Sequence, residues 1–291
     1  MLAHASALVN HIAAARIPDG IPASRCASPE NSVKFVLMTA FGVVGLLLAM
    51  LLAAEIGRRL GRREAARDAG GLAKGTGPAE AAVFALLGLM LAFTFSGAAS
   101  RFEARRHLIT EETNAIGTAY LRVDLLPEDA RPEIQALFHR YLDVRESTYR
   151  NAEDMAATAA RLAEGTALQR KIWTKCVAAS LHPGAPPQAA IVLLPALNAM
   201  IDITATRVMA SRNHPPLIAY CLLAGLALVG SLFVGYGTSV NERRNWLHNL
   251  LFTAILAMTI YVIVDLEFPR FGLIRIDTAD QAFDELRDSL R

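Results

Sequence analysis

The sequence is poor in cysteine and in charge, and both shortages exclude classes of protein. The three cysteines are Cys26, Cys176 and Cys221, and no C-x-x-C pair occurs in the 291 residues, so neither a disulfide framework nor a zinc motif is present. Only 19% of the residues are charged, and 29 Lys and Arg nearly balance 27 Asp and Glu. A nucleic-acid-binding protein needs basic groups against phosphates, and a disordered chain needs low hydrophobicity with high net charge. This composition, 53% apolar, fits neither class.

Familiar catalytic motifs are also missing. The sequence contains no G-x-S-x-G, P-loop, H-E-x-x-H or G-x-G-x-x-G, so it predicts no known enzyme mechanism. Glu103, His107 and Glu111 stand four residues apart, which is a spacing that metal ligands use on a helix. The same spacing is typical of a solvated helix face, and no second cluster completes a metal site. We therefore expect neither an enzyme nor a bound metal or other cofactor.

Long uncharged runs point to a lipid bilayer, in agreement with a mean hydropathy of +0.32. A helix needs roughly 20 apolar residues to cross a bilayer core about 30 Å thick. Runs of 20, 20, 27 and 20 residues without Asp, Glu, Lys or Arg occupy positions 35–54, 81–100, 215–241 and 245–264. Trp246 and Tyr261 stand where interfacial aromatic residues usually lie. The sequence thus predicts an all-α membrane protein with four transmembrane helices.

A fifth uncharged run, at 183–201, is interpreted as an amphipathic helix outside the membrane. It opens with several prolines and carries Pro195 in its middle. Its apolar residues Ile191, Leu194, Leu197 and Ile201 recur at three- and four-residue spacing, which predicts one face buried against protein. The first 30 residues have no apolar core long enough for a cleaved signal, and are expected to form a lead with an interfacial helix near 5–15.

The predicted organisation follows from these runs, whereas the orientation does not. The loops after the first and third spans are basic, from Arg58 to Lys74 and at Arg243 and Arg244, but the opposite side carries a similar number of basic residues. The positive-inside rule therefore leaves the topology open. We predict these segments: 1–32 N-terminal lead, 33–56 first span, 57–78 basic loop, 79–100 second span, 101–214 helical extramembrane domain, 215–237 third span, 238–245 loop, 246–264 fourth span and 265–291 C-terminal tail.

The segment between the second and third spans has the composition of helices, being rich in Ala, Arg, Glu and Leu. No proline occurs between Arg101 and Leu126, so the second membrane helix is expected to continue out of the bilayer as one helix of about 45 residues, near 70 Å long. A second helix is predicted from Pro132 to about residue 164, because proline is favoured in a first turn. Two more are predicted at 168–181 and 188–210.

The spans carry no charge in their middle, which argues against a coupled transporter, since such proteins usually place charged residues in the bilayer. Four apolar helices cannot enclose a water-filled path alone, but copies of one helix around a symmetry axis can. The second span ends in bulky apolar residues followed by small and hydroxyl residues, 89–100. Such a helix suits a pore with a hydrophobic gate. Close helix packing is the alternative explanation of the small residues.

Two motifs resemble the bestrophin channel family. Phe93 stands eight residues before Arg101, which is followed by Phe102-Glu103-Ala104-Arg105, and after the last span come Asp265-Leu-Glu267-Phe-Pro269-Arg-Phe271-Gly272 and Asp277. The layout is similar too, with two spans, a helical insert, two spans and a tail. The stretch from Arg105 to Pro127, with Glu111, is similar to the bacterial group called bestrophin-like.

The resemblance implies a homopentameric ion channel with its termini and helical insert in the cytoplasm, here of a bacterial inner membrane. It implies a neck lined by every fourth residue of the second span, at Phe93, Leu89 and Ala85. Entrance or signature positions are implied at Arg101, Glu103, Arg105 and Glu111, and tail positions at Asp265, Glu267, Pro269 and Gly272. The chain lacks the dense acidic cluster of animal bestrophins after the last span, so calcium regulation is not implied.

Two questions stay open at the level of sequence. Arg101, Arg105 and Arg106 could attract anions, whereas Glu103, Glu111 and Glu112 could attract cations from the same helix. The expected partners of a channel are other copies of the chain, small inorganic ions and the bilayer, with no nucleic acid. The alternative function is a membrane-anchored interaction or scaffold protein without transport activity, because the apolar part of the second span contains no polar ring.

Overall fold

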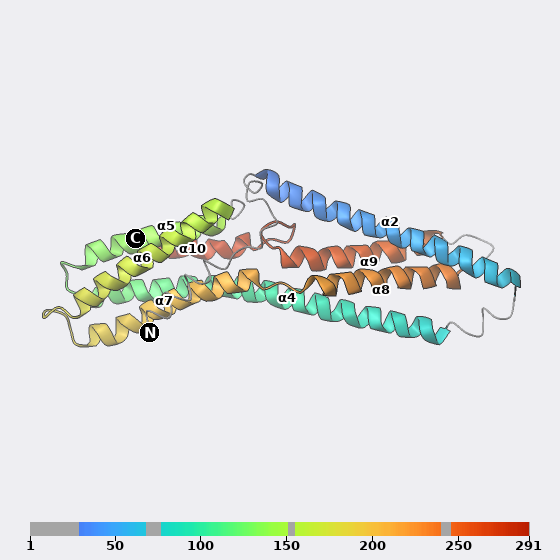
Figure 1. The fold of residues 1–291 in the computed structure, drawn as a ribbon. Helices are drawn as coiled ribbons and strands as arrows, with labels where there is room; N and C mark the ends of the chain where they lie inside the picture. Colours follow the sequence, from blue (N-terminus) through green and yellow to red (C-terminus); the bar gives the residue numbers. More distant parts are fainter. Residues whose placement is uncertain (1–28, 68–76, 151–154, 240–245, 291) are drawn as a thin grey trace. The chain divides into compact units, whose positions relative to one another are not determined.

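The described part of the chain is built from helices. The computed structural model describes residues 29–67, 77–150, 155–239 and 246–290, and none of these residues forms a strand. The predicted interfacial helix near 5–15 lies outside them. Along the chain (Figure 1) the elements are α2 (Pro29–Arg67), α4 (Gly77–Leu121), the 3-10 helix η1 (Arg122–Leu125), α5 (Arg131–Arg150), α6 (Met155–Ser180), α7 (Gln188–Arg212), α8 (Leu217–Gly237), α9 (Trp246–Glu267) and α10 (Asp277–Ser289).

The chain divides into two compact units. The apolar unit comprises residues 33–103 and 213–274, and the extramembrane unit holds residues 104–212 and the tail from residue 275. Helix α4 belongs to both units, because the boundary between residues 103 and 104 falls within it.

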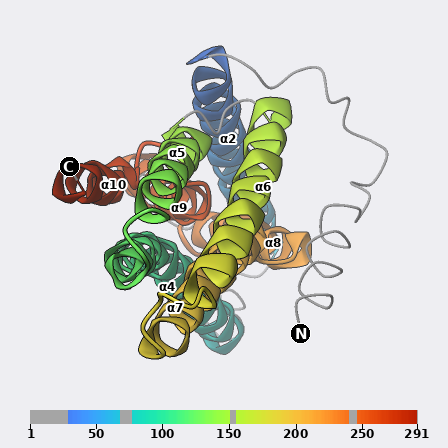
Figure 2. The same cartoon turned by 90° about the vertical axis from the view of Figure 1, so that its left-hand side faces the viewer.

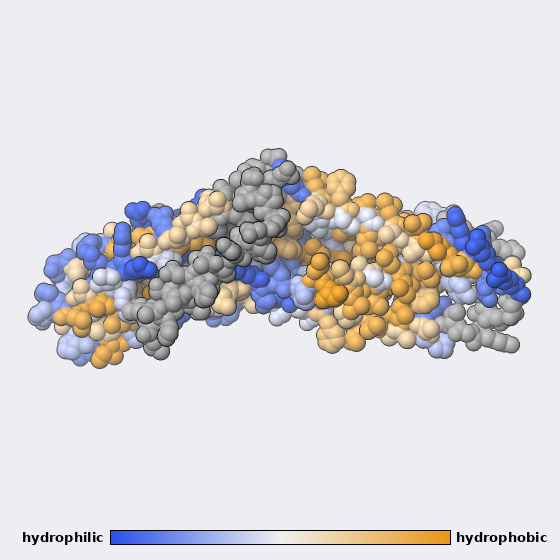
Figure 3. Space-filling view, in the orientation of Figure 1, coloured by the Kyte–Doolittle hydropathy of each residue, from blue (hydrophilic) through white to orange (hydrophobic). Residues whose placement is uncertain are grey.

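Apolar side chains cover the outside of the apolar unit as well as its interior. Four candidate membrane spans occur in the described residues, carried by α2, α4, α8 with the preceding α7, and α9. Large apolar side chains such as Phe41, Leu217 and Ile255 are exposed, and Figure 3 shows hydrophobic surface over these helices. A soluble monomer rarely exposes so large an apolar patch. The inner core consists of Met50, Leu87, Ala98, Leu223, Ala227, Leu256, Ile260, Ile263 and Leu266.

Helices α2 and α8 pack with their backbones in close approach. A Cβ added to Gly57 would meet the carbonyl of Leu232, and one added to Gly235 would meet the backbone of Ala54. Small residues at such contacts let membrane helices approach closely, which strengthens their van der Waals packing. The close approach of α2 and α8 therefore depends on glycine at these contacts.

The extramembrane unit is a helical bundle with its own core (Figure 2). Helix α5 packs on α6, α10 packs on α5, and α7 packs on α6 and η1. The buried apolar side chains of this bundle include Ile109, Ile116, Phe138, Leu142, Ile172, Leu193 and Phe283. A polar exposed surface and an apolar interior distinguish this unit from the apolar unit.

The long helix predicted to leave the second span is confirmed. Helix α4 has 45 residues without interruption, and η1 follows it up to Leu125, two residues before Pro127. The chain then turns, and α5 begins at Arg131, close to the predicted start at Pro132.

The predicted division of the next two helices is wrong. Helix α6 runs from Met155 to Ser180 and crosses residues 165–167, where a break was expected. A Cβ on Gly165 would lie 3.8–3.9 Å from side-chain atoms of Tyr141, Val144 and Arg145, which is an ordinary van der Waals distance. Gly165 thus lies inside α6 against α5, and the helix continues through it.

Helix α7 is confirmed near the predicted bounds, and its predicted buried face is confirmed at Leu197, half-buried at Leu194 and Ile201, and wrong at Ile191. Its buried apolar residues are Ala189, Leu193, Ala196, Leu197 and Met200, while Ile191 is 73% exposed. Apolar residues occur on several sides of α7, so their spacing alone could not select the face that packs. The buried side of α7 carries large residues, Leu193, Leu197 and Met200, as well as alanines.

Candidate functional site

One face of α4 is exposed along both units. Phe93 is 67% exposed and Leu89 is 52% exposed, and Ala85 is exposed one turn earlier. Residues four apart lie on nearly the same side of a helix. The three predicted pore-lining residues therefore share one open face, which continues along α4 through the exposed residues Ser96, Ser100, Glu103, His107 and Glu111.

The opposite side of α4 packs inside the apolar unit. Leu87 and Ala98 belong to the core, and Leu91 packs against that core. Thr94 donates its hydroxyl hydrogen to the carbonyl of Met90 at 2.7 Å, which satisfies a polar group within the helix itself. Leu91 and Phe93 thus occupy different environments although they are two residues apart.

The predicted entrance residues divide between exposed and engaged positions. Arg101 binds the carboxylate of Glu267, and Arg105 is buried and donates to the carbonyl of Ala210 at 3.2 Å. Glu103 is exposed, and Glu111 forms an exposed ion pair with His107 at 3.1 Å. Acidic side chains therefore lie on the open face of α4, whereas these two arginines hold neighbouring segments.

The predicted tail residues form a compact turn after α9. The backbone N–H groups of Leu273 and Ile274 donate to the Asp265 carboxylate at 2.9 and 2.7 Å. Pro269 is the second residue of a turn closed by the Phe271 N–H on the carbonyl of Phe268, at 3.0 Å, where the fixed φ of proline is favoured. This turn brings Asp265 and Gly272 together.

Gly272 lies where a larger residue does not fit. A Cβ at this position would overlap the carboxylate of Asp265. Replacing Gly272 by alanine is expected to destabilise the protein by about 1–3 kcal/mol, because the inserted methyl group must displace that carboxylate from its two backbone donors. The measurement is thermal unfolding in detergent. Gly42→Ala is the control, since nothing lies within 4 Å of a Cβ there, and an equal loss in both variants would contradict the assignment.

Glu267 is fully buried at the end of α9 and contacts two basic side chains. Arg101 donates to Oε1 from Nε at 2.8 Å and from Nη2 at 2.5 Å. His214 places Nδ1 3.4 Å from Oε2. The His214 ring also stacks on Phe268, with 4.8 Å between the ring centroids. Glu267 therefore links α4, α9 and the segment before α8.

A second buried carboxylate, Glu112, lies in the extramembrane unit. Arg145 donates to its Oε1 at 2.5 Å, and Arg207 donates to its Oε2 at 2.6 Å. All three side chains are at most 5% exposed. This buried triad joins α4, α5 and α7, and Arg207 also lies 5.5 Å from the ring centroid of Phe283 on α10.

The triad corrects the expectation that Glu112 contributes to a cation-attracting surface. Burial alone would raise the pKa of Glu112, but the charges and hydrogen bonds of Arg145 and Arg207 lower it below its ordinary value. The carboxylate is therefore ionised and neutralised inside the bundle, where it cannot attract ions from solution. Its neighbour Glu111 lies on another side of α4 and is exposed, because successive residues on a helix are about 100° apart.

A neutral hydrogen-bond network lies beside the triad. The Gln169 amide donates to the Tyr141 hydroxyl at 2.8 Å and to the Thr204 hydroxyl at 3.1 Å. Burial raises the pKa of Tyr141 to about 12, with Arg145 and Glu112 among the charges that act on it. Tyr141 is therefore a neutral phenol in the bundle. The only sequence signal for this network was the presence of polar residues at positions that the helical period places inside.

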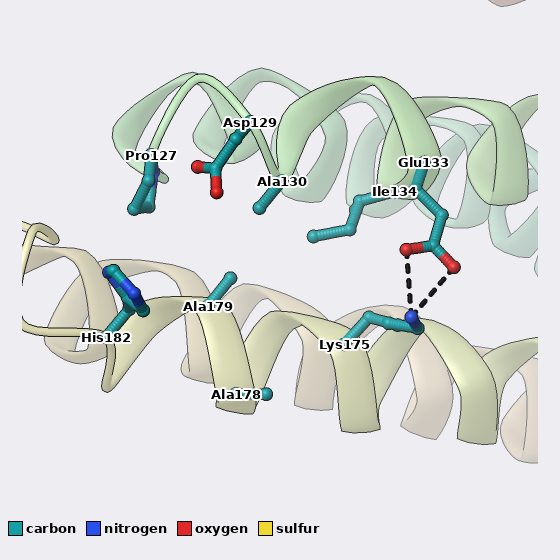
Figure 4. Close-up of a pocket in the computed structure, with 9 residues that line it drawn as sticks. All are labelled: Pro127, Asp129, Ala130, Glu133, Ile134, Lys175, Ala178, Ala179 and His182. Carbon is teal, nitrogen blue, oxygen red and sulfur yellow. Dashed lines mark hydrogen bonds and ion pairs between the residues drawn. The ribbon is translucent and has the colours of Figure 1, made fainter.

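A hollow of about 330 Å³ lies between α5 and α6 (Figure 4). At one end Lys175 binds Glu133 at 2.8 Å, and at the other are Asp129 and His182. These four charged or titratable side chains are exposed, so the hollow is a solvated surface feature. Within the ranges that the structure describes, no group of three His, Cys, Asp or Glu side chains could hold a metal ion.

Four apolar helices and a helical extramembrane part define the class: this is an all-α, multi-pass membrane protein. The chain belongs to the bestrophin-like family, because the family model described as Bestrophin-like domain matches residues 47–280. Neither a search of curated proteins nor a search of solved structures found a match. The family assignment suggests an ion channel rather than an enzyme.

Proposed function

We propose that the protein is a homopentameric ion channel of a bacterial inner membrane, conducting passively through a pore lined by α4. The observation that carries this proposal is the open face of α4, where Phe93, Leu89 and Ala85 are exposed in the single chain. Copies of this face around an axis would form apolar rings, and such rings gate by excluding water. The family to which the chain belongs supports the same function.

The surrounding contacts fit a fixed pore helix. Arg101 attaches α4 to the end of α9 within the apolar unit, and Arg105 attaches α4 to α7 within the extramembrane unit. These contacts would hold the helix at a constant rotation. We place the termini and the extramembrane unit in the cytoplasm, as in bestrophins. Glu103 and Glu111 would then line the cytoplasmic part of the path.

The test combines the assembly state with ion flux. Protein purified in mild detergent is expected to be a multimer by light scattering, and liposomes that contain it are expected to dissipate ion gradients. Separate potassium and chloride gradients would identify the charge of the conducted ion. A strictly monomeric protein, in detergent and in nanodiscs alike, would rule out the channel.

The second candidate is a membrane-anchored scaffold that docks a partner through its extramembrane unit. It is favoured by the wholly apolar character of α4 at positions 85, 89 and 93. Absence of flux under every ionic condition, together with reproducible co-purification of one partner, would support the scaffold.

A further inference from the structure

The residues that contact Glu267 lie close to the boundaries of the apolar unit. Arg101 is two residues before the boundary at Glu103, and His214 is one residue after the boundary at Asn213. Glu267 precedes the turn that ends this unit at Ile274. Three segments that leave the apolar unit are thus held at one buried carboxylate, by contacts that all lie within that unit.

His214 is the titratable member of this group with access to water. Its side chain is 33% exposed, whereas Glu267 is 0% exposed. Phe268, on which the imidazole stacks, in turn contacts Phe35 of α2, with 5.2 Å between the ring centroids. The charged residues at or within two positions of His214 and of the residues in this cluster, Phe35, Arg101, Glu267 and Phe268, are Lys34, Arg101, Glu103, Arg212, Asp265, Glu267 and Arg270.

We propose that His214 is a proton-binding latch that ties the segment before α8 to the end of α9. Protonation gives the imidazole a positive charge opposite the Glu267 carboxylate and over the face of Phe268. A charge-assisted hydrogen bond is shorter and stronger than a neutral one, and a cation is attracted to an aromatic face. The separation of 3.4 Å between Nδ1 and Oε2 leaves room for this bond to shorten.

The sign of the effect follows from the neighbours of His214. Arg101 would repel a protonated imidazole, but it binds the other oxygen of the carboxylate, Oε1, whereas the Glu267 carboxylate and the Phe268 ring would both attract a positive charge on the imidazole. The contact is therefore expected to be stronger when the imidazole carries a proton than when it is neutral. The inference goes beyond the proposed function, because it holds whether or not the chain conducts ions.

Thermal unfolding of the full-length protein in detergent tests the latch. The difference in melting temperature between wild type and His214→Gln is expected to be about 2–4 °C larger at pH 5.5 than at pH 8. His107→Gln is the matched control, because His107 also faces a glutamate, at 3.1 Å, but is 72% exposed. It is expected to behave as wild type at both pH values. A difference for His214→Gln that does not change with pH would overturn the proposal.

Hydrogen exchange in the wild-type protein gives a second test that needs no variant. After correction for the intrinsic effect of pH, the amides of segment 213–220 are expected to exchange more slowly at pH 5.5 than at pH 8. Segment 104–111, which contains the control histidine, is expected to show no such change. Equal protection of segment 213–220 at both pH values would overturn the latch, even if His214→Gln failed to fold.

Discussion

Phe93→Ala is expected to raise the conductance severalfold while leaving the oligomer intact. The side chain is 67% exposed in the single chain, so its removal would leave little cavity in the core of the apolar unit. In a symmetric pore, an apolar ring at this position holds the closed state by excluding water, and a smaller side chain lets water enter. Single-channel currents in planar bilayers measure the effect, and size-exclusion profiles report assembly.

Leu89 and Leu91 provide the matched comparison for Phe93. Leu89→Ala is expected to change the conductance in the same direction, since Leu89 is exposed one turn away on the same face. Leu91→Ala is expected to reduce stability rather than gate the pore, because Leu91 packs against the core. Truncation of a packed leucine costs roughly 2–5 kcal/mol in soluble proteins.

The alternative explanation of the α4 face, helix packing, makes the opposite prediction. If Phe93 were buried between helices of neighbouring subunits, its truncation would cost roughly 3–5 kcal/mol, and assembly would fall without a gain in current. An effect of Leu91→Ala on conductance equal to that of Phe93→Ala would also contradict the pore assignment. These outcomes separate the two explanations.

The sequence predicts the fold where the determining signal is local. Long uncharged runs predicted four spans, and the absence of proline between Arg101 and Leu126 predicted the continuous helix α4. Pro127 likewise lies just before the turn that precedes α5, and Pro132 lies in the first turn of that helix. The predicted break at 165–167 is wrong, because α6 continues there and packs on α5. Tertiary packing overrides local helix preference at this point.

The ion pairs of Glu267 and Glu112 could not be predicted, because they join residues distant in sequence. Arg101 and Glu267 are 166 residues apart, and Glu112 and Arg207 are 95 apart. The sequence places Glu111 and Glu112 side by side with no indication of which one faces inward. Only the position of α5 and α7 shows that Glu112 is the buried one. Tertiary contacts, not composition, therefore determine which charged residues of α4 are available to a pore.

Glu112→Gln is expected to destabilise the extramembrane unit by about 3–5 kcal/mol, because it leaves the buried Arg145 and Arg207 without their counter-charge. Glu111→Gln is the control. Its carboxylate pairs with His107 at the surface, where such a pair contributes about 0–1 kcal/mol. Thermal unfolding in detergent compares the two variants. Equal losses would show that the triad does not hold the bundle.

Two further measurements would show that the buried charge of Glu112 causes this loss of stability: the pH dependence of stability and an apolar replacement of the triad. Because the pKa of Glu112 is lowered from 4.5 in the folded protein, its contribution is complete above that value and declines as the pH falls below it. Glu112→Gln should therefore flatten the acid limb of the stability profile, whereas Glu111→Gln should leave it unchanged. Replacing Glu112, Arg145 and Arg207 together by apolar residues of similar size is expected to cost less than Glu112→Gln alone, because no buried charge is then left uncompensated. A triple variant less stable than Glu112→Gln would show that the triad stabilises by more than mutual neutralisation.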